Sequence, residues 1–431
     1  MKALVSHYKH FLNHTDLLID TDYASLSIKL GSIYFFLGDY DKAKELLTNG
    51  LMGLNKDKRE LSTQIAYGLM HLGMVYRKLG NYKKARELLE ESLLSYNKDG
   101  SQKYKEIALA LEYLGMIFRN LGEYKKGKEC LQKGLKIYKT HYPENYAAIA
   151  RASIYLGYIH KDLGDYKEAE KLLMQGLLLY KKHSSSDHAG IARGLVYLAN
   201  VHRELGNYEQ AKNLLEQSLE IFKKHFPESH TKVAWVLVSL GNVYKDLGKY
   251  DKAKNCFEKS SKIYGKYFGK SHVKVALSLI NLGDVYKQLG KYREAKDLIT
   301  ENLPIYEKSY EINHMETARA LMSLGEIFLL EEDYKNSEIL VNKGLHIAQL
   351  YHHPEFYKSF ESLSNAYLLK HTQVQAIGNT KQAYIFKNQG LKFLRLALEI
   401  VKSYFPNNSF HVSRIKNKLR TAEGSVASVE K

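Results

Sequence analysis

The stretch LGNVYKDLGKY, residues 240–250, contains the pattern that decides the fold. It ends an apolar helical segment with a glycine, Gly248, and places an aromatic residue, Tyr250, two positions later. Glycine is favoured where a helix ends and the chain must turn. The stretch therefore predicts the end of one helix, a turn and the start of a second helix.

The same pattern recurs eight times, at a constant step of 42 residues, from Leu30 to Leu324. The other seven copies are LGSIYFFLGDY, LGMVYRKLGNY, LGMIFRNLGEY, LGYIHKDLGDY, LANVHRELGNY, LGDVYKQLGKY and LGEIFLLEEDY. Apolar residues in both halves of each copy recur at spacings of three and four, which indicates amphipathic helices rather than strands. The sequence thus predicts eight helical hairpins joined without insertion or deletion.

Small residues also recur in register, and they allow two helices to approach closely. An alanine opens every repeat, at Ala24, Ala66, Ala108, Ala150, Ala192, Ala234, Ala276 and Ala318. These columns follow from packing and need no functional explanation.

Leu-Gly, an aromatic residue and Ala at set offsets resemble the signature of the tetratricopeptide repeat family. The family's usual period is about 34 residues, and the longer period here, with loops such as FPESHTKVA and FGKSHVKVA, resembles the kinesin light chain type. The resemblance implies an all-α fold, a right-handed superhelical solenoid of antiparallel helical hairpins with a concave groove that binds other proteins.

The ends of the chain depart from the repeat. Residues 1–20 are interpreted as a partial N-terminal helix or cap, and residues 21–350 as the eight units. Residues 351–405 are expected to form a degenerate ninth repeat with an insertion, whose second helix, GLKFLRLALEIVKSYF, comes about 14 residues late. Residues 406–420 are expected to form a capping helix, and residues 421–431 a flexible tail.

Composition excludes several classes of protein. No apolar run reaches the ~18–20 residues of a membrane span, so the expected location is cytoplasmic, or a host cytoplasm for a bacterial effector.

Cys130 and Cys256 are three repeats apart in one leucine column, so we expect core residues and no disulfide. Four histidines in one column, 188, 230, 272 and 314, are expected to pack in loops rather than bind metal. No cofactor is expected.

Candidate binding residues lie on the face of the first helices that the resemblance assigns to the groove. With Leu240 numbered as position 7 of its repeat, position 12 holds six consecutive cations, at Arg77, Arg119, Lys161, Arg203, Lys245 and Lys287. Neighbouring positions on that face add Arg151, Tyr155, Tyr158, Arg193, Tyr197, Asn200, Trp235 and Asn242. Arginine can grip a carboxylate in bidentate fashion, and asparagine can hold a peptide backbone.

An alternative explanation uses the same cations. Position 13 carries acids beside them, at Asp162, Glu204 and Asp246. A ladder of salt bridges between repeats would account for the column without any partner, although exposed ion pairs contribute only ~0–1 kcal/mol each.

These features favour a non-enzymatic adaptor or scaffold over an enzyme, because the sequence has no phosphate loop, metal spacing or nucleophile motif. The predicted partner is another protein, bound through an extended acidic motif with an aromatic or apolar anchor near Trp235. The resemblance implies the same, since kinesin light chains take short acidic peptides containing tryptophan. The net charge of +17 leaves single-stranded nucleic acid, or another polyanion, as one alternative. A sensor or recruitment module of a larger assembly, or a bacterial effector, is another.

Overall fold

The computed structural model describes residues 20–54, 62–98, 103–183, 186–310, 314–351, 353–407 and 409–424. Within these ranges the chain forms 19 helices and no strand, so the predicted all-α class is confirmed. It divides into two compact units, residues 1–159 with 178–184 and residues 160–177 with 185–431. None of the described helices is long and apolar enough to cross a bilayer.

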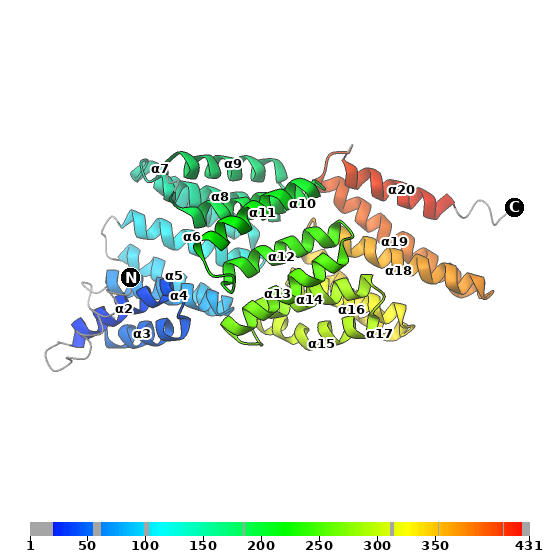
Figure 1. The fold of residues 1–431 in the computed structure, drawn as a ribbon, viewed down its shortest axis with the longest axis horizontal. Coiled ribbons are helices and arrows are strands. Elements are labelled where there is room, and N and C mark those ends of the chain that lie inside the picture. The colour runs from blue at the N-terminus through cyan, green and yellow to red at the C-terminus, as the bar shows by residue number, and fades with distance from the viewer. Residues whose placement is uncertain are drawn as a thin grey trace. The chain divides into compact units, whose positions relative to one another are not determined.

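Sixteen helices form the eight predicted hairpins. Their first helices are α2 (Asp20–Leu37), α4 (Ser62–Lys78), α6 (Tyr104–Asn120), α8 (Tyr146–Asp162), α10 (His188–Glu204), α12 (Thr231–Asp246), α14 (Val273–Gln288) and α16 (Met315–Leu330). Their second helices are α3 (Tyr40–Gly53), α5 (Tyr82–Lys98), α7 (Tyr124–His141), α9 (Tyr166–His183), α11 (Tyr208–His225), α13 (Tyr250–Phe268), α15 (Tyr292–Ser309) and α17 (Tyr334–Tyr351). Each second helix begins at the tyrosine of the repeated stretch. Figure 1 shows the succession of helices along the chain.

The turn in LGNVYKDLGKY is held by backbone hydrogen bonds. The Gly248 N–H donates to the Lys245 carbonyl at 3.0 Å, and the Lys249 N–H donates to the Tyr244 carbonyl at 2.8 Å. This pair of bonds is the Schellman arrangement, which satisfies the last carbonyls of a helix. The Lys249 carbonyl then accepts from the Ala253 N–H at 3.1 Å, so the next helix begins at once.

The turn requires a left-handed backbone conformation, which explains the glycine column. At Gly248 the φ angle is +70°, where an L side chain is disfavoured. In the eighth repeat the equivalent residue is Glu332, which adopts φ +70° despite its side chain. The eighth turn therefore keeps the geometry without the residue that favours it.

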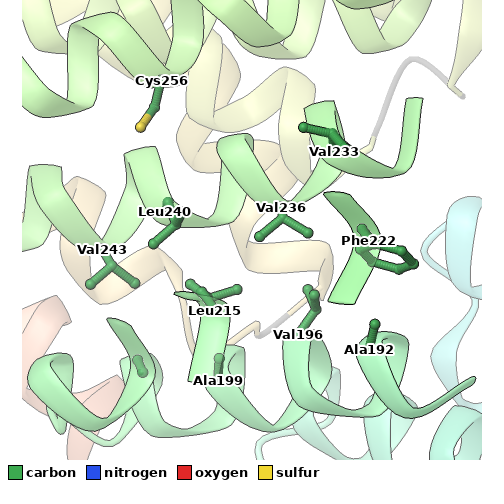
Figure 2. Packing of buried hydrophobic residues seen from close by; sticks show 11 residues of the cluster. Ala192, Val196, Ala199, Leu215, Phe222, Val233, Val236, Leu240, Val243 and Cys256 are labelled. Carbon is green, nitrogen blue, oxygen red and sulfur yellow. The ribbon is translucent and has the colours of Figure 1, made fainter. Parts of the chain in front are cut away.

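The core lies between the helices of successive hairpins. In the second unit, Val196 of α10, Leu215 of α11 and Val236 and Val243 of α12 are fully buried against one another (Figure 2). Burying a side chain of this kind contributes roughly 1.5–3 kcal/mol. Cys256 lies at the edge of the same cluster.

Both cysteines are free thiols, and they differ in exposure. Cys256 is buried as expected, whereas Cys130 is only half-buried. Burial raises the pKa of each thiol to about 11, so both are protonated at neutral pH.

The ninth hairpin consists of α18 (Phe356–Ala376) and α19 (Thr380–Tyr404). Gly390 occupies the place that Gly344 holds in the eighth repeat, 46 residues earlier. Since the regular step is 42 residues, the insertion amounts to four residues rather than the predicted 14 or so. Gly378, with φ +80°, likewise stands 46 residues after Glu332. The offset is therefore constant through the turn, and the extra residues lie before it, where α18 begins.

Helix α20 (Phe410–Gly424) follows α19 and packs against it. It continues four residues beyond the capping helix predicted for residues 406–420, and residues 425–431 lie outside the described part of the chain. The partial N-terminal helix predicted for residues 1–20 lies outside it too, except that α2 begins at Asp20.

Candidate functional site

The second unit contains a pocket of about 310 Å³ between the first helices α12, α14 and α16 and the C-terminal helices α18 and α20. Its cationic lining residues are Arg203, Lys245, Lys287, Arg319, Lys358, Arg414 and Lys418. Its acidic lining residues are Asp246, Asp284, Glu326, Glu355 and Glu361. The volume lies at the lower end of the range of small-ligand pockets, and the lining is dominated by charge.

The structure pairs two cations of position 12 with acids at position 9 of the next repeat. The Lys245 Nζ lies 3.3 Å from the Asp284 Oδ2, and the Lys287 Nζ lies 2.8 Å from the Glu326 Oε2. Both acids occupy position 9, the column that holds Asn242 one repeat earlier. Sequence reasoning looked for partners at position 13 and overlooked this column.

Burial and charge act in opposite directions on these groups. Burial disfavours the charged form of Asp284, but the Lys245 and Lys287 ammonium groups hold its pKa below the usual range. Burial also lowers the pKa of Lys245, and Asp284 offsets part of that change. The pairs are therefore mutually dependent, and removing one partner leaves a buried charge.

A second network centres on Glu204, which has no exposed surface. Its carboxylate contacts the Arg203 guanidinium and lies 3.2 Å from the Lys358 Nζ. Burial raises the pKa of Glu204, but Arg203 and Lys358 outweigh burial and hold it at about 2. The Arg203 Nε also lies 3.6 Å from the Asp246 Oδ2, so here the expected pairing with position 13 is observed.

The buried Lys161 ammonium joins α8 to the segment before α18. Its Nζ lies 2.7 Å from the Glu355 Oε1 and 3.0 Å from the Asp162 Oδ1. Asp162, Glu355 and His353 bring potential metal-ligand atoms within 4.8 Å of one another. Because the Lys161 ammonium contacts both carboxylates and the Arg319 guanidinium lies 3.7 Å from the Glu355 Oε2, the cluster is explained as a buried network of ion pairs.

Two amide side chains in the pocket have unused hydrogen-bonding capacity. Asn242 and Gln288 both line it. Neither side chain makes a hydrogen bond to any residue within the described ranges. An amide offers one acceptor and two donors, so these two residues can bind the backbone of an extended segment.

Trp235 and the residues near it lie elsewhere in the second unit. The Trp235 and Tyr197 rings meet edge to face with centroids 5.4 Å apart, and Trp235 packs against two core clusters. Trp235, Tyr197, Arg193 and Asn200 are not among the lining residues of the pocket. Four other predicted residues do line the pocket: Arg203, Asn242, Lys245 and Lys287. The structure therefore separates them from Trp235, the predicted aromatic anchor.

The remaining predicted site residues belong to the first unit. The Arg151 guanidinium grips the fully buried Glu112 carboxylate, with Nε 2.5 Å and Nη2 3.1 Å from its two oxygens. The Arg119 guanidinium lies 4.0 Å from the ring centroid of Tyr158. Arg77 and Tyr155 complete the group, the first half-buried and the second buried.

Sequence reasoning missed the C-terminal contribution to the pocket. Tyr357, Lys358 and Arg414 line it from α18 and α20. These residues lie outside the 42-residue pattern, so no column indicated them. The one signal was the insertion in the ninth repeat.

Three of the four histidines in the column cap helices, and the fourth, His188, stacks on His225 with ring centroids 4.0 Å apart. The Nδ1 atoms of His230, His272 and His314 accept the N–H of the residue two positions later at 3.1–3.2 Å. The His272 ring also stacks on Phe268 with centroids 4.2 Å apart. Helix capping and ring stacking therefore account for the recurrence of histidine at this position.

Family models for the tetratricopeptide repeat match residues 64–140, 146–224 and 232–308, and a further one matches residues 24–51. The chain belongs to the tetratricopeptide repeat family. A model described as anaphase-promoting complex subunit 5 matches residues 193–265, within the same repeats. None of the curated proteins compared with this sequence matches it significantly.

Two solved structures share the fold of this tetratricopeptide repeat protein at low sequence identity, and a third is similar over part of the chain only. A Rap protein complexed with Competence and Sporulation Factor has a TM-score of 0.60 at 13% identity, covering 88% of this chain and 99% of that chain. The Rap conjugation gene regulator of plasmid pLS20, in complex with the Phr* peptide, has a TM-score of 0.56 at 15% identity, covering 76% and 96%. A putative kinesin light chain of Podosopora anserina matches at 20% identity and TM-score 0.36, covering 49% and 98%. The predicted solenoid of helical repeats is thus confirmed.

Proposed function

We propose that this tetratricopeptide repeat protein is a non-enzymatic interaction scaffold that binds an extended segment of a protein or peptide in the pocket of its second unit. The observation that carries the proposal is the pair of amides, Asn242 and Gln288, which lack a hydrogen-bond partner among the described residues and lie within a charged pocket. A peptide backbone supplies the donors and acceptors that match them. That one of the structurally similar proteins is bound to a peptide supports the same class of ligand.

An acidic ligand is favoured by the balance of charge. The lining has seven Lys or Arg residues and five Asp or Glu residues. Arg414 and Lys418 share one acid, Glu361, with an oxygen of its carboxylate 2.7 Å from a nitrogen of each. A ligand carboxylate near these two cations would relieve an unbalanced charge, whereas one near Lys245 or Lys287 would compete with an existing partner.

The proposal is tested with short labelled peptides whose Asp and Glu residues are replaced by Asn and Gln in a matched set. We expect the acidic set to bind more tightly in fluorescence anisotropy. Asn242→Ala should weaken binding by roughly 2- to 10-fold, since one hydrogen bond contributes about 0.5–1.5 kcal/mol. Asn200→Ala is the matched control, because Asn200 holds position 9 one repeat earlier, away from the pocket.

Equal binding by both variants would contradict the proposed site. A parallel titration with single-stranded RNA at two salt concentrations addresses the polyanion alternative. Saturable, steeply salt-dependent RNA binding without peptide binding would reverse the assignment.

A further inference from the structure

The C-terminal helices return to the early repeats of the second unit, at the turns of the fourth and fifth hairpins. The Tyr404 ring lies directly against Gly164, and the His411 ring lies 3.4 Å from where a Cβ on Gly206 would be. The equivalent turns at Gly248 and Gly290 have no neighbour of this kind within 4 Å among the described residues. Two turns of the array are thus covered by residues far away in the sequence.

Hydrogen bonds and ion pairs hold this contact. The His411 Nε2–H donates to the Glu204 carbonyl at 2.9 Å, and the Tyr357 hydroxyl donates to the His411 Nδ1 at 3.1 Å. Lys358 reaches Glu204 and Asp246, with its Nζ 3.2 and 3.5 Å from their carboxylates. We call this contact the clasp; its residues are Glu355, Tyr357, Lys358, Tyr404 and His411 on one side and Lys161, Gly164, Glu204, Gly206 and Asp246 on the other.

The four inserted residues of the ninth repeat explain how the clasp forms. Helix α18 begins at Phe356, whereas α16, moved by the offset of 46 residues, would begin at residue 361. The additional turn carries Tyr357 and Lys358, and Glu355 immediately precedes it. The insertion therefore supplies the residues that reach back to the fourth and fifth repeats.

The clasp is less extensive than the contacts between neighbouring hairpins inside the array. Helices α16, α18 and α19 meet through apolar side chains, with Leu329, Ala366 and Phe386 in one cluster. The clasp combines an aromatic contact, the Phe405 ring stacked on Tyr166 with centroids 5.1 Å apart, with buried charges. The cost of removing those charges from water can equal or exceed their mutual attraction. Such a contact is specific in geometry and small compared with the apolar contacts between neighbouring hairpins.

We propose that the clasp is a reversible closure, which opens while the helical hairpins on either side stay folded. Because Tyr357 and Lys358 belong to both the clasp and the pocket, opening removes one wall of the pocket. The closure goes beyond the proposed binding function and does not depend on what the pocket binds.

The test uses the full chain with both cysteines replaced by leucine, the residue that otherwise fills their column. Spin labels are attached at Lys167→Cys in α9 and Lys402→Cys in α19, both exposed positions close in sequence to the clasp. In this labelled protein, with no clasp residue replaced, pulsed electron paramagnetic resonance should give a single population of short distances between the two labels. Glu355→Gln, which leaves Lys161 without one of its two carboxylates, should add a longer population.

Hydrogen exchange provides the second measurement. We expect Glu355→Gln to speed exchange in residues 404–415 and around the turns at Gly164 and Gly206, with α13 to α15 unchanged. Tyr404→Ala, which leaves the ion pairs intact, should act in the same direction and serves if the first variant fails to fold. Glu112→Gln removes an equally buried carboxylate between neighbouring repeats, so it should leave both readouts at the clasp unaltered.

A distance distribution that stays unchanged in both clasp variants would overturn the proposal. So would exchange that rises in parallel throughout the second unit, because the contact would then be a permanent part of the fold.

Discussion

Replacing the buried hub of the clasp, Glu204→Gln, should destabilise the second unit by about 3 kcal/mol at pH 7. The magnitude follows from the pKa of Glu204, which Arg203 and Lys358 hold at about 2 against burial, compared with an ordinary value of 4.5. A tenfold change in an acid dissociation constant corresponds to about 1.36 kcal/mol of free energy. The lost carboxylate also leaves the Arg203 and Lys358 charges less compensated.

The pH dependence distinguishes this cause from a simple packing defect. Because the folded pKa is below the unfolded one, the stabilisation is complete above pH 4.5 and is lost as pH falls toward 2. The difference between the two proteins should therefore shrink, and by pH 3 more than half of it should be gone.

Urea denaturation monitored by tryptophan fluorescence measures this difference directly. Trp235 is the only tryptophan in the sequence, and it packs against the core clusters of the second unit. Glu209→Gln is the control, since the Glu209 side chain is 58% exposed and should change stability by less than about 0.5 kcal/mol. A Glu204→Gln effect below about 1 kcal/mol, or one that is equal at pH 7 and pH 3, would refute the reasoning.

Three further predictions concern single sites. Glu332→Gly, made in a Lys370→Met background, should be about 1 kcal/mol more stable than Lys370→Met alone in thermal or urea unfolding. The reason is that Glu332 adopts φ +70°, and its ion pair with the buried Lys370, 2.9 Å from Nζ to Oε1, is absent from both proteins. Glu331→Gly in the same background should not stabilise the protein. The rate at which Lys232 reacts with an amine-selective acylating reagent should have its pH midpoint near 8, because burial, and to a smaller extent the Arg193 charge, lower the pKa of Lys232 to about 8. Arg193→Gln should raise that midpoint. Peptide mass spectrometry follows the reaction. Leu215→Ala should cost about 2–5 kcal/mol of unfolding free energy, because Leu215 is fully buried; a loss under about 1 kcal/mol would contradict the packing in Figure 2.

The pairing of position 12 changes what a charge-reversal experiment can show. From the sequence, reversing Arg193, Arg203 and Lys245 together would be expected to abolish partner binding without altering stability. In the structure Arg203 and Lys245 form buried or half-buried ion pairs with Asp246 and Asp284. Their reversal should therefore destabilise the second unit, and it cannot serve as a clean test of binding.

The candidate site was predictable in part. Arg203, Asn242, Lys245 and Lys287 were identified because the regular helix assigns their positions to one face, and all four line the pocket. Trp235 was placed in the groove by the same argument, but its ring packs against Tyr197 and it does not line the pocket. Helical periodicity gives the direction of a side chain to within a face, and neighbouring repeats decide what it touches.

The same local pattern of apolar residues, small residues and a turn glycine occurs eight times in this sequence. For that reason the sequence alone determined the helical hairpins, their 42-residue step, the turn geometry at Gly248 and the family. Each of these depends on residues within one repeat or its neighbour. The clasp and the pocket join residues such as Lys161 and Glu355, which are 194 positions apart. Only the tertiary structure decided these contacts, because they depend on how the rotation between hairpins accumulates over several repeats.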